Sequence, residues 1–232
     1  MKVEQVSEHI WCIRSWLLIP VRVWVVIEQD GVTLVDAGMP FMAIGILKAI
    51  DGLGAGPLKQ ILLTHGHSDH VGAVQKIMER KSTPLYAHRI EIPYMEGEQL
   101  YPGRKKRERN VQPGLAKPLP ETEDKELASI AGLRPYLTPG HSPGHVVYYH
   151  EKDRVLLAGD LFTSKRGRLY RPMPMFTADM AGALKSSLII RKLQPKHLEV
   201  CHGNSVKNPA EQLDAYLQET ATSYSIPAGT WQ

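Results

Sequence analysis

The sequence has little cysteine, and it has no uninterrupted hydrophobic run long enough to cross a membrane. Cys12 and Cys201 are the two cysteines among 232 residues, too few for a disulfide framework, which favours a reducing compartment. The most apolar stretch, IWCIRSWLLIPVRVWVVI (10–27), is broken by two arginines and a proline, and no small-residue cleavage site follows it. The stretch therefore predicts β-strands and not a signal peptide or a membrane span, and we expect a cytoplasmic protein.

Low-complexity tracts and a strong charge of one sign are also missing. The chain is 43% hydrophobic and 22% charged, which suits a globular domain with a sizeable core. Its net charge of +4 mildly favours anionic ligands but identifies none. We expect a single domain over residues 1–232 with a lid or insertion at 91–120, because that stretch combines turn residues with a run of six charged residues.

The charged run, Arg104 to Arg109, is interrupted by Glu108. A charge run in a loop is usually a solvated face, whereas a continuous basic stripe is the usual sign of nucleic-acid binding. We therefore expect a small-molecule substrate, with neither nucleic acid nor a membrane as partner.

The order of predicted elements indicates an α/β layered domain made of two similar halves. Asp30-Gly31 between two β-branched runs predicts one hairpin, and HVVYYHEKDRVLLAGD predicts another that turns at Lys152-Asp153. Hydrophobic periodicity and short apolar runs predict the remaining elements. The predicted helices are 41–52, 69–80, 178–193 and 208–222, and the predicted strands are 59–64, 84–88, 133–138 and 196–201.

The strand at 59–64 leads into an unusual cluster, in which three histidines and an aspartate fall within residues 65–70. Side chains alternate along an extended segment, so His65 and His67 point the same way and can bind one metal ion. Asp69 and His70 come where the chain turns into a helix and can reach a second ion. Because such a cluster would be costly to bury unpaired, it predicts metal binding.

Three further strands end in suitable ligands, within TPGHSPGH, LLAGDLF and EVCHGN. The point where a strand runs into a loop is the usual place for a site in an α/β fold. His65, His67 and one more histidine would form the three-nitrogen set that zinc uses when it keeps a position open for water. Spacing alone leaves His141 and His145 as equal candidates for the third position. Asp36, in VDAG, is expected to be a turn residue or a support near the site.

A second set would consist of Asp69, His70 and His202. Asp160 has two carboxylate oxygens and could bridge both ions, or it could be a turn or helix-capping residue. Cys201 is interpreted as a buried strand cysteine and not as a ligand. The other histidines are expected to be structural: His9, His88, His150 and His197.

The motifs THGHSDH, TPGHSPGH, AGD and CHGN, in this order and spacing, resemble those of the metallo-β-lactamase superfamily from about Val23 to Leu217. The resemblance implies a four-layer αββα sandwich with the metals at one edge, between the two sheets. It favours His141 over His145 and makes Asp160 the bridging residue. The implied ligands of two divalent ions are His65, His67, Asp69, His70, His141, Asp160 and His202. Nitrogen-rich ligation favours zinc, with iron and manganese as alternatives.

Within that superfamily the chain resembles the glyoxalase II-like and lactonase-like branch. The bridging aspartate and the lack of a predicted signal peptide differ from true zinc β-lactamases, and His67 differs from the Glu of flavodiiron proteins. The length leaves little room for the inserted domain of the nucleic-acid-cleaving branches. Two departures remain: little chain follows His202 where glyoxalase II has a helical extension, and Thr163 stands where acyl-homoserine lactonases have Tyr.

We therefore expect a dinuclear metal-dependent hydrolase of a thioester, lactone or related ester, in which a hydroxide bridging the ions attacks an acyl carbon. Asp69 or Asp160 would accept the proton. The alternatives are a metal-dependent phosphodiesterase or nuclease of the same fold, and a non-catalytic metal-binding relative. Five side chains could either line an apolar cleft or pack in the core: Phe162, Tyr170, Met173, Met175 and Phe176.

Overall fold

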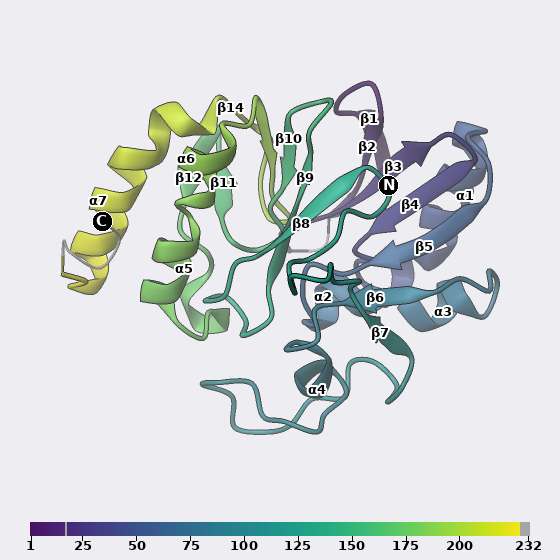
Figure 1. Cartoon of the computed structure of the whole chain (residues 1–232), viewed down its shortest axis with the longest axis horizontal. Helices are drawn as coiled ribbons and strands as arrows, with labels where there is room; N and C mark the ends of the chain where they lie inside the picture. Colours follow the sequence, from purple (N-terminus) through teal and green to yellow (C-terminus); the bar gives the residue numbers. More distant parts are fainter. Residues whose placement is uncertain (17, 228–232) are drawn as a thin grey trace.

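The computed structural model describes residues 1–16 and 18–227, in which two β-sheets lie between two layers of helices (Figure 1). The first sheet has seven strands, which neighbour one another in chain order. They are β1 (Lys2–Gln5), β2 (Ile10–Trp16), β3 (Pro20–Glu28), β4 (Gly31–Val35), β5 (Leu58–Leu62), β6 (Leu85–Ala87) and β7 (Ala116–Pro118). Strands β1 to β4 are antiparallel to their neighbours, and β4 to β7 run parallel.

The second sheet has five strands in the order β14-β13-β10-β9-β8. They are β8 (Leu133–Leu137), β9 (Val146–His150), β10 (Val155–Leu157), β13 (His197–Glu199) and β14 (Val206–Lys207). Among the described residues of this sheet, β10 and β13 form the one parallel pair, and the other neighbouring strands are antiparallel. A separate hairpin consists of β11 (Thr163–Lys165) and β12 (Arg168–Tyr170).

Helices cover the outer face of each sheet. All helices of the first half are η1 (Pro40–Met42), α1 (Ala43–Leu53), α2 (Ser68–Val71), α3 (Val74–Met78) and α4 (Ile92–Met95), in the part of the chain that the structure describes. Those of the second half are η2 (Pro174–Phe176), α5 (Met180–Ser186), α6 (Ile189–Leu193), η3 (Pro209–Gln212) and α7 (Leu213–Tyr224). Figure 1 shows α1 and α3 outside the first sheet, and α5, α6 and α7 outside the second. The predicted αββα sandwich is confirmed. No helix in the described part of the chain has the length and apolarity needed to span a bilayer.

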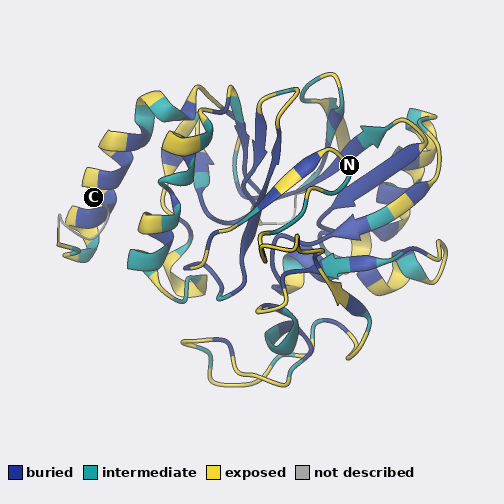
Figure 2. Cartoon of the chain, in the orientation of Figure 1, coloured by how far each residue is buried: buried dark blue, intermediate teal, exposed yellow. Residues whose placement is uncertain are grey.

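The core fills the space between the sheets and the space beneath the helices of both halves, as the buried positions in Figure 2 show. Strand β9 illustrates why. Val146 and Tyr148 belong to the cluster that includes the first sheet, whereas Val147 and Tyr149 belong to the cluster that includes α5 and α7. Because successive side chains of a strand point to opposite faces, a strand covered on both sides must be apolar throughout.

Both predicted hairpins are present, but two predicted helices are each divided in two. The segment 69–80 breaks between α2 and α3, and 178–193 breaks between α5 and α6. A Cβ at Gly72, in the first break, would lie 2.6 Å from Pro40 Cδ and 2.9 Å from the carbonyl oxygen of Gly38, so only glycine allows this close approach.

The segment 91–120 is not wholly the surface excursion that its composition suggested. Its last part, β7, extends the first sheet, and Glu91 and Met95 at its start are fully buried. Helix α4 and the long loop that joins it to β7 project from the sandwich near β6 and β7 (Figure 1).

A buried ion pair joins the two sheets. Nη1 of Arg22, on β3, lies 2.9 Å from Oε2 of Glu199, on β13, and the two side chains are 5% and 0% exposed. The indole N–H of Trp24 points to the same carboxylate oxygen at 3.4 Å. Removing one partner of such a pair leaves the other charge buried without compensation.

We expect Glu199→Ala to lower the free energy of unfolding by about 3–5 kcal/mol, because Arg22 would stay buried without a counter-charge. Urea unfolding of chelator-treated protein measures this loss without a contribution from bound metal. The double variant Arg22→Met, Glu199→Leu removes both charges and should recover most of the stability. A double variant as unstable as Glu199→Ala would show that lost packing, and not the unpaired charge, causes the effect.

Candidate metal centre

The structure brings all seven predicted ligands together at one edge of the sandwich. Each follows a strand end: β5 leads to the HGHSDH segment, β8 to the HSPGH loop, β10 to AGD and β13 to CHGN. They form two groups whose potential ligand atoms lie within 4.8 Å of one another, with a carboxylate between them. The seven are His65, His67, Asp69, His70, His141, Asp160 and His202.

The first group consists of three converging imidazoles. Nδ1 of His67 lies 3.0 Å from Nε2 of His65 and 3.0 Å from Nε2 of His141. A ring nitrogen offers either one hydrogen or one lone pair, so His67 Nδ1 cannot satisfy both partners fully. Nitrogens bound tetrahedrally to one zinc ion at about 2.0–2.1 Å would lie roughly 3.3 Å apart, close to the spacing found here.

Burial lowers the pKa of each of these three imidazoles below its ordinary value, that of His67 to about 4. The rings are therefore neutral at physiological pH. Neutral imidazole is the form that binds a metal ion, so the environment of His65, His67 and His141 fits ligation.

The second group combines Asp69, His70 and His202. Oδ2 of Asp69 lies 3.0 Å from Nε2 of His202 and 3.7 Å from Nε2 of His70. Burial lowers the pKa of both histidines, but the nearby carboxylates, Asp160 among them, outweigh it and raise the pKa of each above its ordinary value. This half of the site thus favours added positive charge, which a divalent ion would supply in place of protons.

Asp160 lies between the two groups. Its Oδ1 is 3.4 Å from Nε2 of His70, and its Oδ2 is 3.5 Å from Nε2 of His141 and 3.4 Å from Nε2 of His202. Asp160 Oδ1 and Nε2 of His70 are buried and have no hydrogen-bond partner within the described chain, and Nε2 of His202 lies 3.0 Å from Asp69 Oδ2 without hydrogen-bond geometry. Buried polar atoms are nearly always paired, so these facing, unpaired atoms fit ligands arranged around metal ions.

Asp36 supports the second group from behind. It has a left-handed backbone conformation (φ 59°), and its Oδ2 accepts a hydrogen bond of 2.8 Å from Nδ1 of His70. The amide and hydroxyl of Thr64 each donate to the same carboxylate at 2.8 Å. This contact fixes the imidazole so that Nε2 faces the cluster. The expectation that Asp36 is a turn or supporting residue is confirmed.

The structure separates the two histidines that spacing left as equal candidates. His141 joins the first group, whereas Nε2 of His145 accepts the backbone N–H of Asp160 at 3.2 Å. Its Nδ1 lies 2.9 Å from the hydroxyl of Thr138. His145 therefore holds the loop that carries Asp160. Cys201 packs in the hydrophobic core, as predicted, although its sulfur also lies near the second group.

Sequence reasoning missed Glu91, a fully buried carboxylate that links two ligand loops. Its Oε1 accepts hydrogen bonds from the Gly66 amide at 2.9 Å and from the Tyr101 hydroxyl at 2.8 Å. Its Oε2 accepts from the Ser142 hydroxyl at 2.9 Å and the Gly144 amide at 2.8 Å. Burial raises the pKa of Glu91, while these four donors favour the ionised form. No local sequence pattern marks this residue, because its partners come from three separate segments.

A cavity of about 270 Å³ opens beside the candidate ligands. It is lined by Ile19, Met39, His67, Ser68, Asp69, Arg104, Glu108, Asp160, Met173 and Phe176. Of the five side chains that could line a cleft, Met173 and Phe176 do so. Phe162 is fully buried in the core, and Met175 is 79% exposed.

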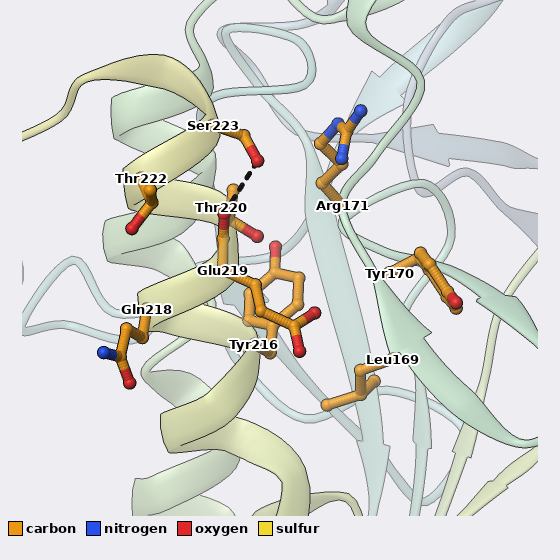
Figure 3. A pocket seen from close by; sticks show the side chains of 9 residues that line it. All are labelled: Leu169, Tyr170, Arg171, Tyr216, Gln218, Glu219, Thr220, Thr222 and Ser223. Carbon is orange, nitrogen blue, oxygen red and sulfur yellow. Dashed lines mark hydrogen bonds between the residues drawn. The ribbon is translucent and has the colours of Figure 1, made fainter.

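Tyr170 lines a different hollow, between β12 and α7, which Figure 3 shows from close by. That hollow contains Arg171 and Tyr216, and none of the seven candidate ligands lines it. The cavity beside the ligands is therefore the candidate substrate pocket.

We expect Glu91→Gln to lower the free energy of unfolding by about 1–3 kcal/mol, because the amide NH₂ must then face the backbone N–H of either Gly66 or Gly144. Since both loops carry candidate ligands, the variant should also bind zinc more weakly, as competition with a chromophoric chelator would measure. Glu96→Gln is the matched control, because this buried carboxylate accepts one amide, from Gly114 at 2.9 Å, and a Gln oxygen can replace it. Unchanged zinc affinity in Glu91→Gln would contradict the positioning role.

Comparison with known proteins agrees with this architecture. Residues 17–202 match the model of the metallo-beta-lactamase superfamily. The chain is 39% identical over 221 residues to the probable metallo-hydrolase YybB of Bacillus subtilis, covering 94% of this chain and 98% of that protein. It is 34% identical over 138 residues to the hydroxyacylglutathione hydrolase of Ectopseudomonas mendocina, covering 58% of this chain and 45% of that enzyme.

Solved structures share the fold over most of the chain. The mono-zinc form of the metallo-beta-lactamase FIM-1 from Pseudomonas aeruginosa superposes with a TM-score of 0.75 at 16% identity, covering 97% of this chain and 96% of the other. The di-iron-bound form of TTHA1623 superposes with a TM-score of 0.66 at 27% identity, covering 85% and 94%. Together with the sequence matches, these similarities show that the chain belongs to the metallo-β-lactamase superfamily.

Proposed function

We propose that this chain is a dinuclear metal-dependent hydrolase that opens a thioester, a lactone or a related ester. The main support for this proposal is the position of Asp160. Its two oxygens face ring nitrogens of both histidine groups at 3.4–3.5 Å, and the residue also lines the pocket. A carboxylate in that position can hold two ions next to each other.

In this proposal each group of side chains holds one ion. His65, His67 and His141 would hold the first, Asp69, His70 and His202 would hold the second, and Asp160 could contact both. Two bound divalent ions would polarise the substrate carbonyl and make water a nucleophile at neutral pH. Nitrogen-rich ligation favours zinc, with iron as the alternative that the di-iron form of TTHA1623 supports.

The two aspartates differ in what they can do. The side chain of Asp69 is 28% exposed at the pocket, whereas that of Asp160 is 6% exposed. Burial raises the pKa of Asp69, but His70 and His202 outweigh it and lower the pKa to about 2. Asp69 is therefore ionised at physiological pH, and a carboxylate oxygen of Asp69 can receive the proton that the attacking water loses.

The pocket favours a thioester over a homoserine lactone. The acyl-homoserine lactonases, whose branch this chain resembles, use a tyrosine where this chain has Thr163, and Tyr170 lies at the other hollow. No tyrosine is among the described residues that line the pocket. Similarity to a hydroxyacylglutathione hydrolase over part of the chain supports the same choice.

The substrate class is tested by a turnover panel on zinc-loaded protein, with a thioester, a homoserine lactone, a β-lactam and a phosphodiester. We expect hydrolysis of the thioester, and at most weaker hydrolysis of the lactone. Treatment with a chelator should abolish this activity and added zinc should restore it, since bound ions would activate the attacking water. Cleavage of the phosphodiester alone would overturn the proposed bond class.

The bridging role is tested by Asp160→Asn, which removes the negative charge and keeps the size of the side chain. We expect kcat/KM to fall by about 100-fold and bound zinc to fall below two ions per chain, as measured by elemental analysis. Asp214→Asn is the control, because the side chain of Asp214 is 87% exposed on α7, and it should keep both ions and full turnover. An Asp160→Asn protein with two ions and full activity would disprove the bridging role.

A further inference from the structure

Two residues of the charged run, Arg104 and Glu108, line the pocket. Arg104 is half-buried and lines the cavity, whereas the other cations of the run are exposed. Those exposed cations are Lys105, Lys106, Arg107 and Arg109. Arg104 is the one cationic side chain among the described residues that line the pocket. The rest of the run is thus a solvated face, as predicted.

The guanidinium of Arg104 is held in place but is not neutralised. Its central carbon lies 5.1 Å from the centre of the Phe176 ring, a cation–π contact that fixes the head of the side chain. Glu108 lines the same cavity, yet within the described chain no carboxylate lies within 4.0 Å of an Arg104 nitrogen. The planar set of N–H donors is therefore free to bind a carboxylate or a phosphate.

Apart from Ser68, the remaining wall of the pocket is apolar. Ile19, Met39, Met173 and Phe176 line it, and Ile19 and Phe176 are 40% and 37% exposed. Large apolar side chains left exposed at a cavity are a common sign of a binding site for an apolar group. The cavity, at about 270 Å³, is slightly smaller than most pockets for drug-sized ligands, so it fits a short chain.

The charge balance of the loaded pocket also favours an anion. Two divalent ions and Arg104 would contribute +5, and Asp69, Glu108, Asp160 and the bridging hydroxide would contribute −4, so the loaded pocket would keep a net charge of +1. In a small cavity such an excess attracts an anionic group.

We propose that the substrate is a short-chain acyl ester or thioester that carries a carboxylate or phosphate group. Arg104 binds the anionic group, and the apolar wall contacts the chain that joins it to the scissile bond. This inference rests on the proposed function and adds a substrate class and a specificity-determining residue to it.

The kinetic test compares two thioesters of the same thiol, a neutral hexanoyl and an adipoyl that ends in a carboxylate. The wild type should prefer the adipoyl thioester. Arg104→Ala should lower kcat/KM for this substrate by about tenfold, mainly through KM, and change the hexanoyl thioester less than about twofold. Arg104→Lys should restore only part of the preference, because it keeps the charge but loses the planar fork. Lys105→Ala, an exposed neighbour, is the control and should leave both substrates unchanged.

A binding measurement separates this inference from the proposed reaction. Calorimetry of zinc-loaded protein with hexanesulfonate, which has no bond to hydrolyse, should give a Kd about tenfold weaker for Arg104→Ala and an unchanged Kd for Lys105→Ala. If neither thioester is hydrolysed but this difference in Kd is found, the proposed reaction fails and the anion site stands. If both thioesters are hydrolysed without preference and Arg104→Ala binds hexanesulfonate like the wild type, the inference is overturned and the proposed reaction stands.

Discussion

The fold has to hold five imidazoles and two carboxylates close together in one largely buried site. Such groups lose hydration on burial, and several of them face one another with lone pairs and no hydrogen-bond partner. A flexible chain would relieve this by turning the side chains to water. The surrounding fold prevents it: Asp36 fixes His70, His145 holds the loop of Asp160, and Glu91 holds two ligand loops at once. Preorganised ligands of this kind suit ions that need a fixed geometry.

Strand direction explains why the ligands meet at one edge. Strands β4 and β5 are parallel neighbours in the first sheet, and β10 and β13 are parallel neighbours in the second. Because parallel strands end at the same edge, the loops after each pair emerge side by side, and β8 ends at this edge too because it and β10 are both antiparallel to β9. Packing one sheet on the other then brings the loops of both pairs together. The antiparallel strand β3 closes this edge, since the carbonyl of Pro20 lies 2.8 Å from Nδ1 of His202 and Arg22 pairs with Glu199.

The sequence predicted the parts of the molecule that local patterns encode. Both hairpins, the strands at 59–64 and 133–138, and the gathering of the histidine motifs follow from turn residues, alternation and motif spacing, with the resemblance deciding between His141 and His145. The division of the helices at 69–80 and 178–193 was missed, because periodicity continues across a break that tertiary contacts impose. Glu91 was missed for a similar reason, since its donors lie 10 to 53 residues away. The inward turn of Arg104 depends on a loop conformation, which composition does not encode.

Some residues of the segment 91–110 support the ligand loops, and others line the pocket. Glu91 and Tyr101 support the ligand loops, and the side chain of Asn110 donates to the carbonyl of Gly66 at 3.0 Å. Arg104 and Glu108, which lie between these supports in the chain, face the pocket instead. Replacing the whole segment would remove the supports and disturb the ligand geometry. Single substitutions at Arg104 or Glu108 would alter the charge of the pocket and leave the supports in place. Under the proposed function, substrate preference can therefore diverge through these two positions while the candidate metal ligands keep their geometry.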